Sequence, residues 1–149
     1  LASRISARVP PSWPPELLSD DILRMIIRRI KDGDDPLYFS WYWVLRDAES
    51  DERVLVGFGG FSTAAPDGSS AEMGYMVAGG FQGRGLATEA VHHLCAWLFT
   101  NTPVMQVVAC TFPDHRASIR VLETNGFLLH GDGPEEGTVR YLLARDRCP

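Results

Sequence analysis

Four glycines crowd into one short stretch of the sequence, with a glutamine and an arginine among them. Glycine lets the backbone come close to a ligand, because no side chain stands in the way. A helix that starts directly after such a stretch adds unpaired backbone N–H groups and the positive end of its dipole. Residues 82–87 therefore predict a cradle for a pyrophosphate group, with Arg84 as a neighbouring cation. The glycines are Gly79, Gly80, Gly83 and Gly85.

The spacing of this segment separates it from two common phosphate-binding motifs. A P-loop needs the pattern GxxxxGK[ST] and a dinucleotide-binding turn needs GxGxxG, and neither pattern occurs here. Short motifs also match by chance. The alternative is a tight glycine turn that joins a strand to a helix and binds nothing. The elements on either side of the turn are needed to choose between these two interpretations.

Those elements place the turn between a strand and a helix. Residues 70–78 read as a strand, residues 86–99 as a helix, and residues 104–112 as a nearly continuous apolar strand, which is typical of burial on both faces. The apolar face expected for the helix consists of Leu86, Ala90, Leu94, Trp97 and Leu98.

The remaining sequence predicts further elements of one domain, which we expect to span residues 1–149. Prolines make 9–15 an extended loop that Trp13 anchors on the core. Ser19 or Asp20 begins a helix that ends at Gly33. Its apolar positions are Leu23, Ile26, Ile27 and Ile30.

Further strands are expected before the glycine-rich turn and near the end of the sequence. Residues 38–46, 53–63 and 70–78 form an antiparallel meander, with polar turns at 47–52 and 64–69. Asp114 caps a short helix that runs to Thr124 and stops at Gly126. Residues 127–130 and 138–144 form a closing hairpin.

Composition excludes several classes of function. A net charge of −5 argues against a general nucleic-acid binder, and no apolar run approaches the ~20 residues of a membrane span. We find no signal peptide and expect a cytoplasmic protein. The three cysteines show no CxxC spacing, so we expect no metal site and no disulfide framework, but two buried thiols and one at the chain end.

Three separated segments, in this order, resemble the GNAT-type N-acetyltransferase superfamily. The family motif Q/R-x-x-G-x-G/A is matched by Gln82, Gly85 and Ala87. The spellings AEMGYMV at 71–77 and RASIRVLETNGF at 116–127 extend the likeness over roughly residues 38–145, and are most similar to the branch that acetylates N-terminal amines of ribosomal proteins. The resemblance implies an α/β (α+β) acyl-CoA N-acyltransferase fold, with a mixed, mostly antiparallel, twisted sheet flanked by helices and splayed at the coenzyme site.

The resemblance also implies where acetyl-CoA would bind. The pantetheine arm would pair with the strand at Met76 and Val77, and His115 stands where many relatives have an asparagine that contacts this arm. Ser118 could bond the coenzyme or approach its sulfur. The pyrophosphate would meet the segment made of Gln82, Gly83, Arg84, Gly85, Leu86 and Ala87.

The catalytic groups are less fully implied. Glu72 is the candidate base, directly or through water, and its alternative is a solvated strand glutamate. A backbone N–H near Met76 or Val77 could stabilise the oxyanion. Many relatives carry a tyrosine that protonates the thiolate where this chain has Leu122, so the proton donor is Ser118, water or none. His115 could do acid–base work or be an exposed residue at a helix start.

We expect direct transfer from acetyl-CoA to a primary amine, because Cys110 has no paired base for a covalent intermediate. In the family the early helices wall the acceptor site, which would make Trp13, Pro14 and Arg24 acceptor contacts. The alternatives are an acyl-CoA-binding module without transferase activity and a nonspecific nucleotide-phosphate binder. The resemblance allows a homodimer, and leaves open whether the family's first strand is missing, because residues 1–8 give none.

Overall fold

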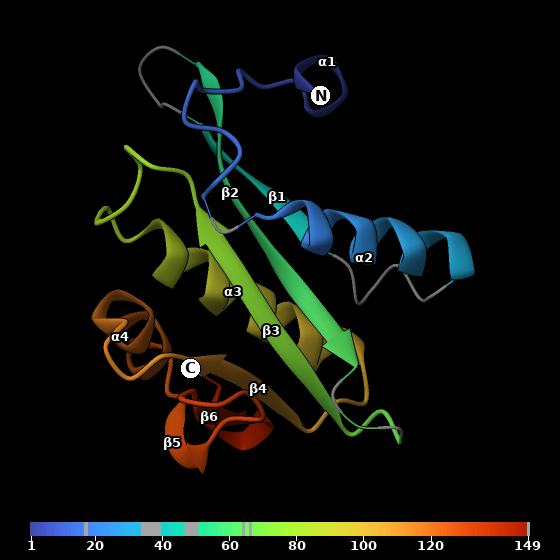
Figure 1. Cartoon of the computed structure of the whole chain (residues 1–149), viewed down its shortest axis with the longest axis vertical. Coiled ribbons are helices and arrows are strands. Elements are labelled where there is room, and N and C mark those ends of the chain that lie inside the picture. Colours follow the sequence, from blue (N-terminus) through green and yellow to red (C-terminus); the bar gives the residue numbers. More distant parts are fainter. Residues whose placement is uncertain (17, 34–39, 47–50, 64, 66, 149) are drawn as a thin grey trace. The chain divides into compact units, whose positions relative to one another are not determined.

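Six strands form a mixed sheet in the order β1-β2-β3-β4-β6-β5 (Figure 1). The computed structural model describes residues 1–16, 18–33, 40–46, 51–63, 65 and 67–148. The strands are β1 (Ser40–Arg46), β2 (Arg53–Thr63), β3 (Ser70–Val77), β4 (Gln106–Thr111), β5 (Leu128–Asp132) and β6 (Val139–Ala144). The helices are α1 (Ala2–Ile5), α2 (Asp20–Asp32), α3 (Leu86–Asn101), α4 (Arg116–Thr124) and the 3-10 turn η2 (Arg145–Arg147).

The pairing of these strands confirms the predicted fold class, a mixed and mostly antiparallel sheet flanked by helices. β1 with β2, β4 with β6 and β5 with β6 pair antiparallel, whereas β3 with β4 pairs parallel. By its contacts the chain divides into two compact units, Leu1–Gly60 with Tyr75–Leu86 and Phe61–Gly74 with Ala87–Pro149. The single domain expected for 1–149 stays a prediction.

In the first unit, the ends of α2 confirm the sequence signals. The Ser19 side chain accepts a hydrogen bond from the N–H of Ile22 at 3.3 Å, and Gly33 ends the helix in the left-handed conformation, with φ of 81°. The ring of Trp13 packs edge-on against Tyr42 and Phe58, at centroid distances of 6.0 and 6.5 Å, so the proline-rich loop is anchored as expected.

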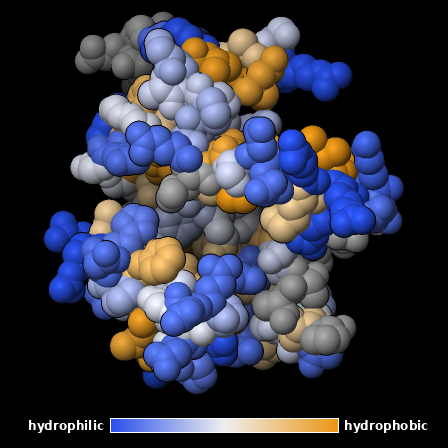
Figure 2. Space-filling model, in the orientation of Figure 1, coloured by the Kyte–Doolittle hydropathy of each residue, from blue (hydrophilic) through white to orange (hydrophobic). Residues whose placement is uncertain are grey.

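The apolar stripe of α2 is not buried, and this differs from what its periodicity suggests. No residue of this helix is buried, and Figure 2 shows hydrophobic residues at the surface among the charged residues of α2. The large exposed side chains are Leu23, Met25, Ile27 and Ile30. Helical periodicity predicts an apolar face but does not say what covers it.

The N-terminal residues contain a helix and a single bridge in place of a strand. Ala2–Ile5 form α1, and Arg8 makes an isolated parallel bridge to Val54. The N–H of Arg8 donates to the Arg53 carbonyl at 2.8 Å, and the N–H of Leu55 donates to the Arg8 carbonyl at 2.9 Å. One residue of 1–8 is thus bonded as a strand residue would be, and the missing first strand of the family stays a prediction.

In the second unit, two local predictions are wrong. The buried side of α3 contains Val91, Cys95, Leu98 and Phe99, and of the predicted face only Leu98 belongs to it. This helix is apolar around most of its circumference, so periodicity does not single out one face. The first residue before α4 is His115, not Asp114, and its side chain makes no capping hydrogen bond.

The closing hairpin is confirmed, with Leu128 opposite Leu142 and Leu129 opposite Tyr141. A few predicted features lie wholly or partly outside the described residues: the start of strand 38–46, most of the turn at 47–52, and Ala64 and Pro66 of the turn at 64–69. Among the helices that the structure describes, none combines the length and the apolar character that crossing a membrane would require.

Candidate functional site

The turn between β3 and α3 has the backbone shape that its glycines predict. Gly80, Gly83 and Gly85 take positive φ angles of 64°, 72° and 77°, which only glycine adopts without strain. A Cβ atom added at any of the three would meet nothing within 4 Å. The turn therefore needs glycine for its conformation, and its outer surface is open to an approaching group.

This turn also presents unpaired backbone donors. Among the described residues, none accepts a hydrogen bond from the N–H groups of Gly83, Arg84, Gly85 or Leu86. α3 begins at Leu86, so the N–H groups of its first turn follow directly. The Arg84 guanidinium lies over the Phe81 ring, 5.7 Å from its centroid, which holds a cation beside these donors.

Gln82 ties this turn to the end of β3. Its Nε2 donates to the Val77 carbonyl at 3.1 Å, and the N–H of Ala78 donates to the Val56 carbonyl at 2.8 Å. Val77 and Met76 are half-buried. The sequence predicts Gln82 in the cradle. In the structure its amide fixes the turn to the strand that precedes it.

β3 and β4 pair over only part of their length. Among the described residues the parallel ladder joins Ser70–Glu72 to Gln106–Val108, although β3 continues to Val77 and β4 to Thr111. Backbone groups beyond Glu72 and Val108 are therefore not consumed by pairing between these two strands. The exposed Glu72 stands at the last pair, where the ladder ends.

A charged group that the sequence did not single out lies on the same face of the sheet as Glu72. Arg140 on β6 is directly opposite Cys110 on β4. Burial raises the pKa of the Cys110 thiol, and the negative charge of Glu72 raises it further, while the charge and a hydrogen bond of Arg140 act to lower it. The thiol thus lies within the electrostatic reach of both a carboxylate and a guanidinium, and it is held in its neutral form.

The start of α4 carries the other two predicted groups. His115 is exposed, and its Nδ1 lies 3.4 Å from the Thr111 Oγ1. Ser118 is half-buried in the first turn of α4. Leu122 is 1 % exposed, so this position belongs to the core of the second unit and offers no proton.

The predicted site residues divide between the two units. Met76, Val77 and the turn from Gln82 to Leu86 belong to the first unit. Glu72, Ala87, His115 and Ser118 belong to the second. Arg140 was missed because its relation to Glu72 depends on strand register, and the only signal available was its place in the predicted closing hairpin.

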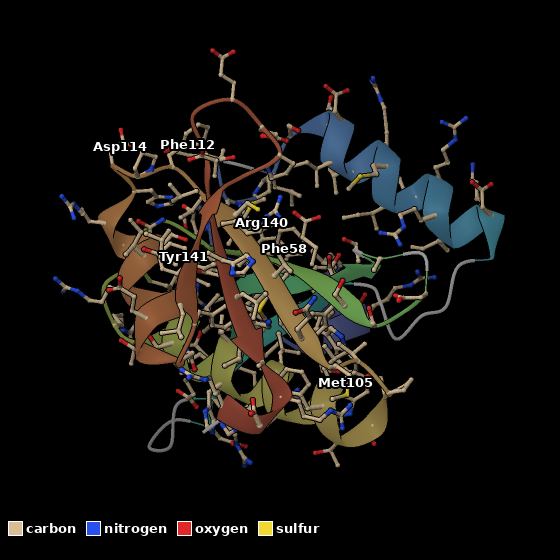
Figure 3. The ribbon with its side chains drawn as sticks, turned by 90° about the horizontal axis from the view of Figure 1, so that it is seen from below. Phe58, Met105, Phe112, Asp114, Arg140 and Tyr141 are labelled. Carbon is tan, nitrogen blue, oxygen red and sulfur yellow. The ribbon has the colours of Figure 1, made fainter. Side chains whose placement is uncertain are left out.

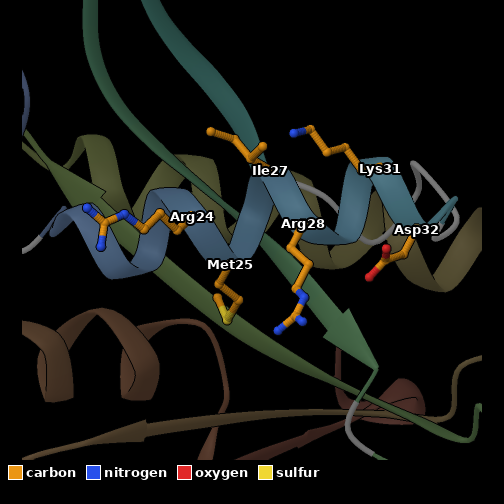
Figure 4. Close-up of a pocket in the computed structure, with 6 residues that line it drawn as sticks. All are labelled: Arg24, Met25, Ile27, Arg28, Lys31 and Asp32. Atoms are coloured by element: carbon orange, nitrogen blue, oxygen red, sulfur yellow. The ribbon is translucent and has the colours of Figure 1, made fainter.

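Two surface hollows contain charged side chains. One lies along α2 and is formed by that helix alone, including Arg24, which the sequence marked as an acceptor contact (Figure 4). The other lies at the connection between β5 and β6 and contains the carboxylates of Asp132, Glu135 and Glu136. In the part of the chain that the structure describes, no three His, Cys, Asp or Glu side chains gather as a metal site would require.

Comparisons with known proteins give one family. The model of the acetyltransferase (GNAT) domain matches residues 4–128. No curated protein is similar enough to count as a match.

Several solved structures share the fold. A spermidine N-acetyltransferase from Vibrio cholerae is 18 % identical, with a TM-score of 0.65 over 85 % of this chain and 75 % of that one. A ribosomal-protein-S5-alanine acetyltransferase from Vibrio fischeri is 20 % identical, with a TM-score of 0.62 over 87 % and 72 %. A domain from Methanocaldococcus jannaschii is 21 % identical, with a TM-score of 0.63 over 70 % of this chain, which spans 65 % of that structure's length. These likenesses show the fold, and the family match covers most of the residues: the chain belongs to the GNAT acetyltransferase family.

Proposed function

We propose that the protein transfers an acetyl group from acetyl-CoA to a primary amine by direct attack. The observation that carries the proposal is the turn at Gly83–Gly85, which leaves its backbone N–H groups unpaired at the start of α3. Such a turn binds a pyrophosphate through several N–H groups and a helix dipole at once. Membership of the acetyltransferase family makes coenzyme A the pyrophosphate ligand to test first.

The residues present fit the coenzyme. Gly83 and Gly85 leave space where any side chain would project, and Arg84 supplies a cation. The end of the β3–β4 ladder at Glu72 supports pairing of Met76 and Val77 with the amides of the pantetheine arm, on the side of β3 that faces β4. We assign Ala87, His115 and Ser118 to contacts with the same ligand.

Direct transfer needs few protein groups. The neutral amine attacks the carbonyl carbon, the carbon–sulfur bond breaks, and the amine proton passes to Glu72 or to water. The leaving thiolate is a fairly weak base, with a pKa near ~8.5 by comparison with cysteine, so water or Ser118 suffices to protonate it. Cys110 is not a nucleophile in this scheme, because burial and Glu72 raise the pKa of its thiol.

The acceptor class is the least specified part of the proposal. Solved relatives are described as acting on spermidine and on ribosomal protein S5 alanine. The acidic hollow at Asp132, Glu135 and Glu136 would attract a protonated amine from solution. We therefore propose a protein N-terminus or a small-molecule amine.

A charge placed in the turn tests the coenzyme site. Gly85→Glu puts a carboxylate where the pyrophosphate would lie and a side chain at φ of 77°. We expect calorimetry to show coenzyme A binding at least tenfold weaker. The new carboxylate repels the pyrophosphate as a like charge, and it also takes the place of the pyrophosphate at the positive end of the helix dipole. Gly68→Glu is the matched control, because Gly68 has φ of 70° and equally open surroundings in the β2–β3 turn. Wild-type affinity in Gly85→Glu would place the pyrophosphate elsewhere.

Product formation separates the enzyme from a binding module. The buried Leu122, which cannot give a proton, is the observation that favours an acyl-CoA-binding module without transferase activity. Coenzyme A binding without thiol release on any amine of a broad panel would favour that module. Thiol release that falls in Glu72→Gln, with coenzyme affinity retained, would support transfer with Glu72 as base.

A further inference from the structure

Arg140 is a half-buried cation on the face of the sheet that carries Glu72. Successive β6 residues point to opposite faces. In Figure 3, Tyr141 lies toward α4, and its hydroxyl donates to Glu123 of that helix at 3.4 Å, whereas Arg140 lies on the other side of β6. The face shared by Arg140 and Cys110 is only partly covered.

Strand register connects Arg140 with Glu72. Glu72 is opposite Val108, Val108 is opposite Leu142, and Arg140 lies two residues from Leu142 on β6. A shift of two residues keeps a side chain on the same face. Adjacent strands are about 4.8 Å apart, so the two backbone positions are separated by roughly 10 Å across the sheet, plus the two-residue offset along it. Both side chains are long enough to contact one small molecule between them.

Among the residues that the structure describes, none forms an ion pair with Arg140. No described carboxylate lies within 4.0 Å of its guanidinium nitrogens, and the side chain acts instead on the neutral Cys110 thiol opposite it. Glu72 and Glu135 are the carboxylates that act on the same thiol, and neither forms an ion pair with Arg140. Removing a charge from water is costly, so the more an arriving ligand covers this guanidinium, the more it gains from pairing with it. A bound anion would supply the missing partner.

We propose that Arg140 is a specificity-determining residue that binds a carboxylate carried by the acceptor amine. The inference rests on the proposed acetyl transfer, with the amine at Glu72 and the carboxylate at Arg140. Guanidinium and carboxylate match in shape and form two parallel hydrogen bonds. The separation of the two residues favours acceptors whose amine and carboxylate are several bonds apart, such as ω-amino acids and short peptides, over those in which the groups are adjacent.

The test compares acceptors in pairs that differ only in the carboxylate. The probes are 6-aminohexanoate and its amide, and the dipeptide Ala-Ala and its amide, with thiol release giving kcat/KM for each. We expect Arg140→Gln to lower kcat/KM for the free acids by about tenfold to a hundredfold, mainly through KM, and to change the amides by less than about twofold. Arg140→Lys should restore part of the loss. Arg120→Gln, the same charge change on the exposed side of α4, should leave every probe unaffected.

Two results would overturn this role for Arg140. One is wild-type protein that prefers neither member of a pair; the other is an equal loss on acids and amides, which indicates a structural role. If wild-type protein turns over no amine, the transferase proposal fails separately. Ligand-observed NMR with coenzyme A present then decides the Arg140 assignment: Arg140-dependent binding of 6-aminohexanoate over its amide supports it, and no such preference overturns it.

Discussion

Gly57 on β2 lies so close to the end of β3 that the structure leaves no room for a side chain at this position. A Cβ atom at this position would lie 2.6 Å from the Met76 carbonyl oxygen and 2.9 Å from the Trp43 ring. Both distances are too short for a real contact, so Gly57→Ala must displace one of the two groups. The nearer one is backbone and cannot simply rotate away. We expect a loss of about 2–3 kcal/mol in the free energy of unfolding, the upper part of the range for overpacked cores.

Urea unfolding measures this loss, and Gly74→Ala on β3 is its matched control. A Cβ at Gly74 meets nothing within 4 Å, and the residue does not take a positive φ, so this change should be within about 0.5 kcal/mol of wild type. Because the displaced carbonyl belongs to Met76, we also expect weaker coenzyme A binding in Gly57→Ala alone. Equal stability of the two variants would refute the close approach of β2 to the end of β3.

Two further predictions concern the second unit. Arg145 donates to the carbonyls of Phe99 and Val104 at 2.5 and 2.9 Å, so Arg145→Met should lower the free energy of unfolding in urea by about 2–4 kcal/mol. Arg147→Met, at an exposed position, should lower it by almost nothing. Similar losses in the two variants would contradict the hydrogen bonds of Arg145. Burial raises the pKa of the Cys95 thiol, so above pH ~8.5 only the unfolded chain loses this proton. The free energy of unfolding therefore falls as the pH rises, by up to about 1.4 kcal/mol per pH unit. Cys95→Ala, less stable at neutral pH, should show a shallower fall between pH 7 and 10 under reducing conditions, and an unchanged slope would refute the assignment.

Local signals made much of the fold predictable. Ser19 and Gly33 mark the ends of α2 because capping depends on residues next to one another in the chain. Gly83 and Gly85 mark the turn before α3 for the same reason, since a positive φ is a property of a single residue. These features need no knowledge of what packs against them.

Features that depend on distant residues were not predictable in this way. The buried side of α3 is decided by what the helix contacts, and Val91 and Cys95 are buried although the sequence favoured Ala90 and Leu94. The need for glycine at position 57 comes from Met76, a residue on another strand. Periodicity describes one element, whereas burial and close approach describe two.

The face of the sheet that carries Glu72, Cys110 and Arg140 depends most strongly on such long-range order. On β4 and β6 the inward positions Val107, Ala109 and Leu143 alternate with Cys110 and Arg140. A slip of one residue in the pairing would bury the guanidinium and expose the apolar residues, so the core fixes the register. The same packing that stabilises the second unit thereby sets Arg140 opposite Cys110, on the face where Glu72 ends the β3–β4 ladder. On the proposal that Arg140 binds the carboxylate of the acceptor, this specificity depends on one side chain of a strand whose register the core already fixes.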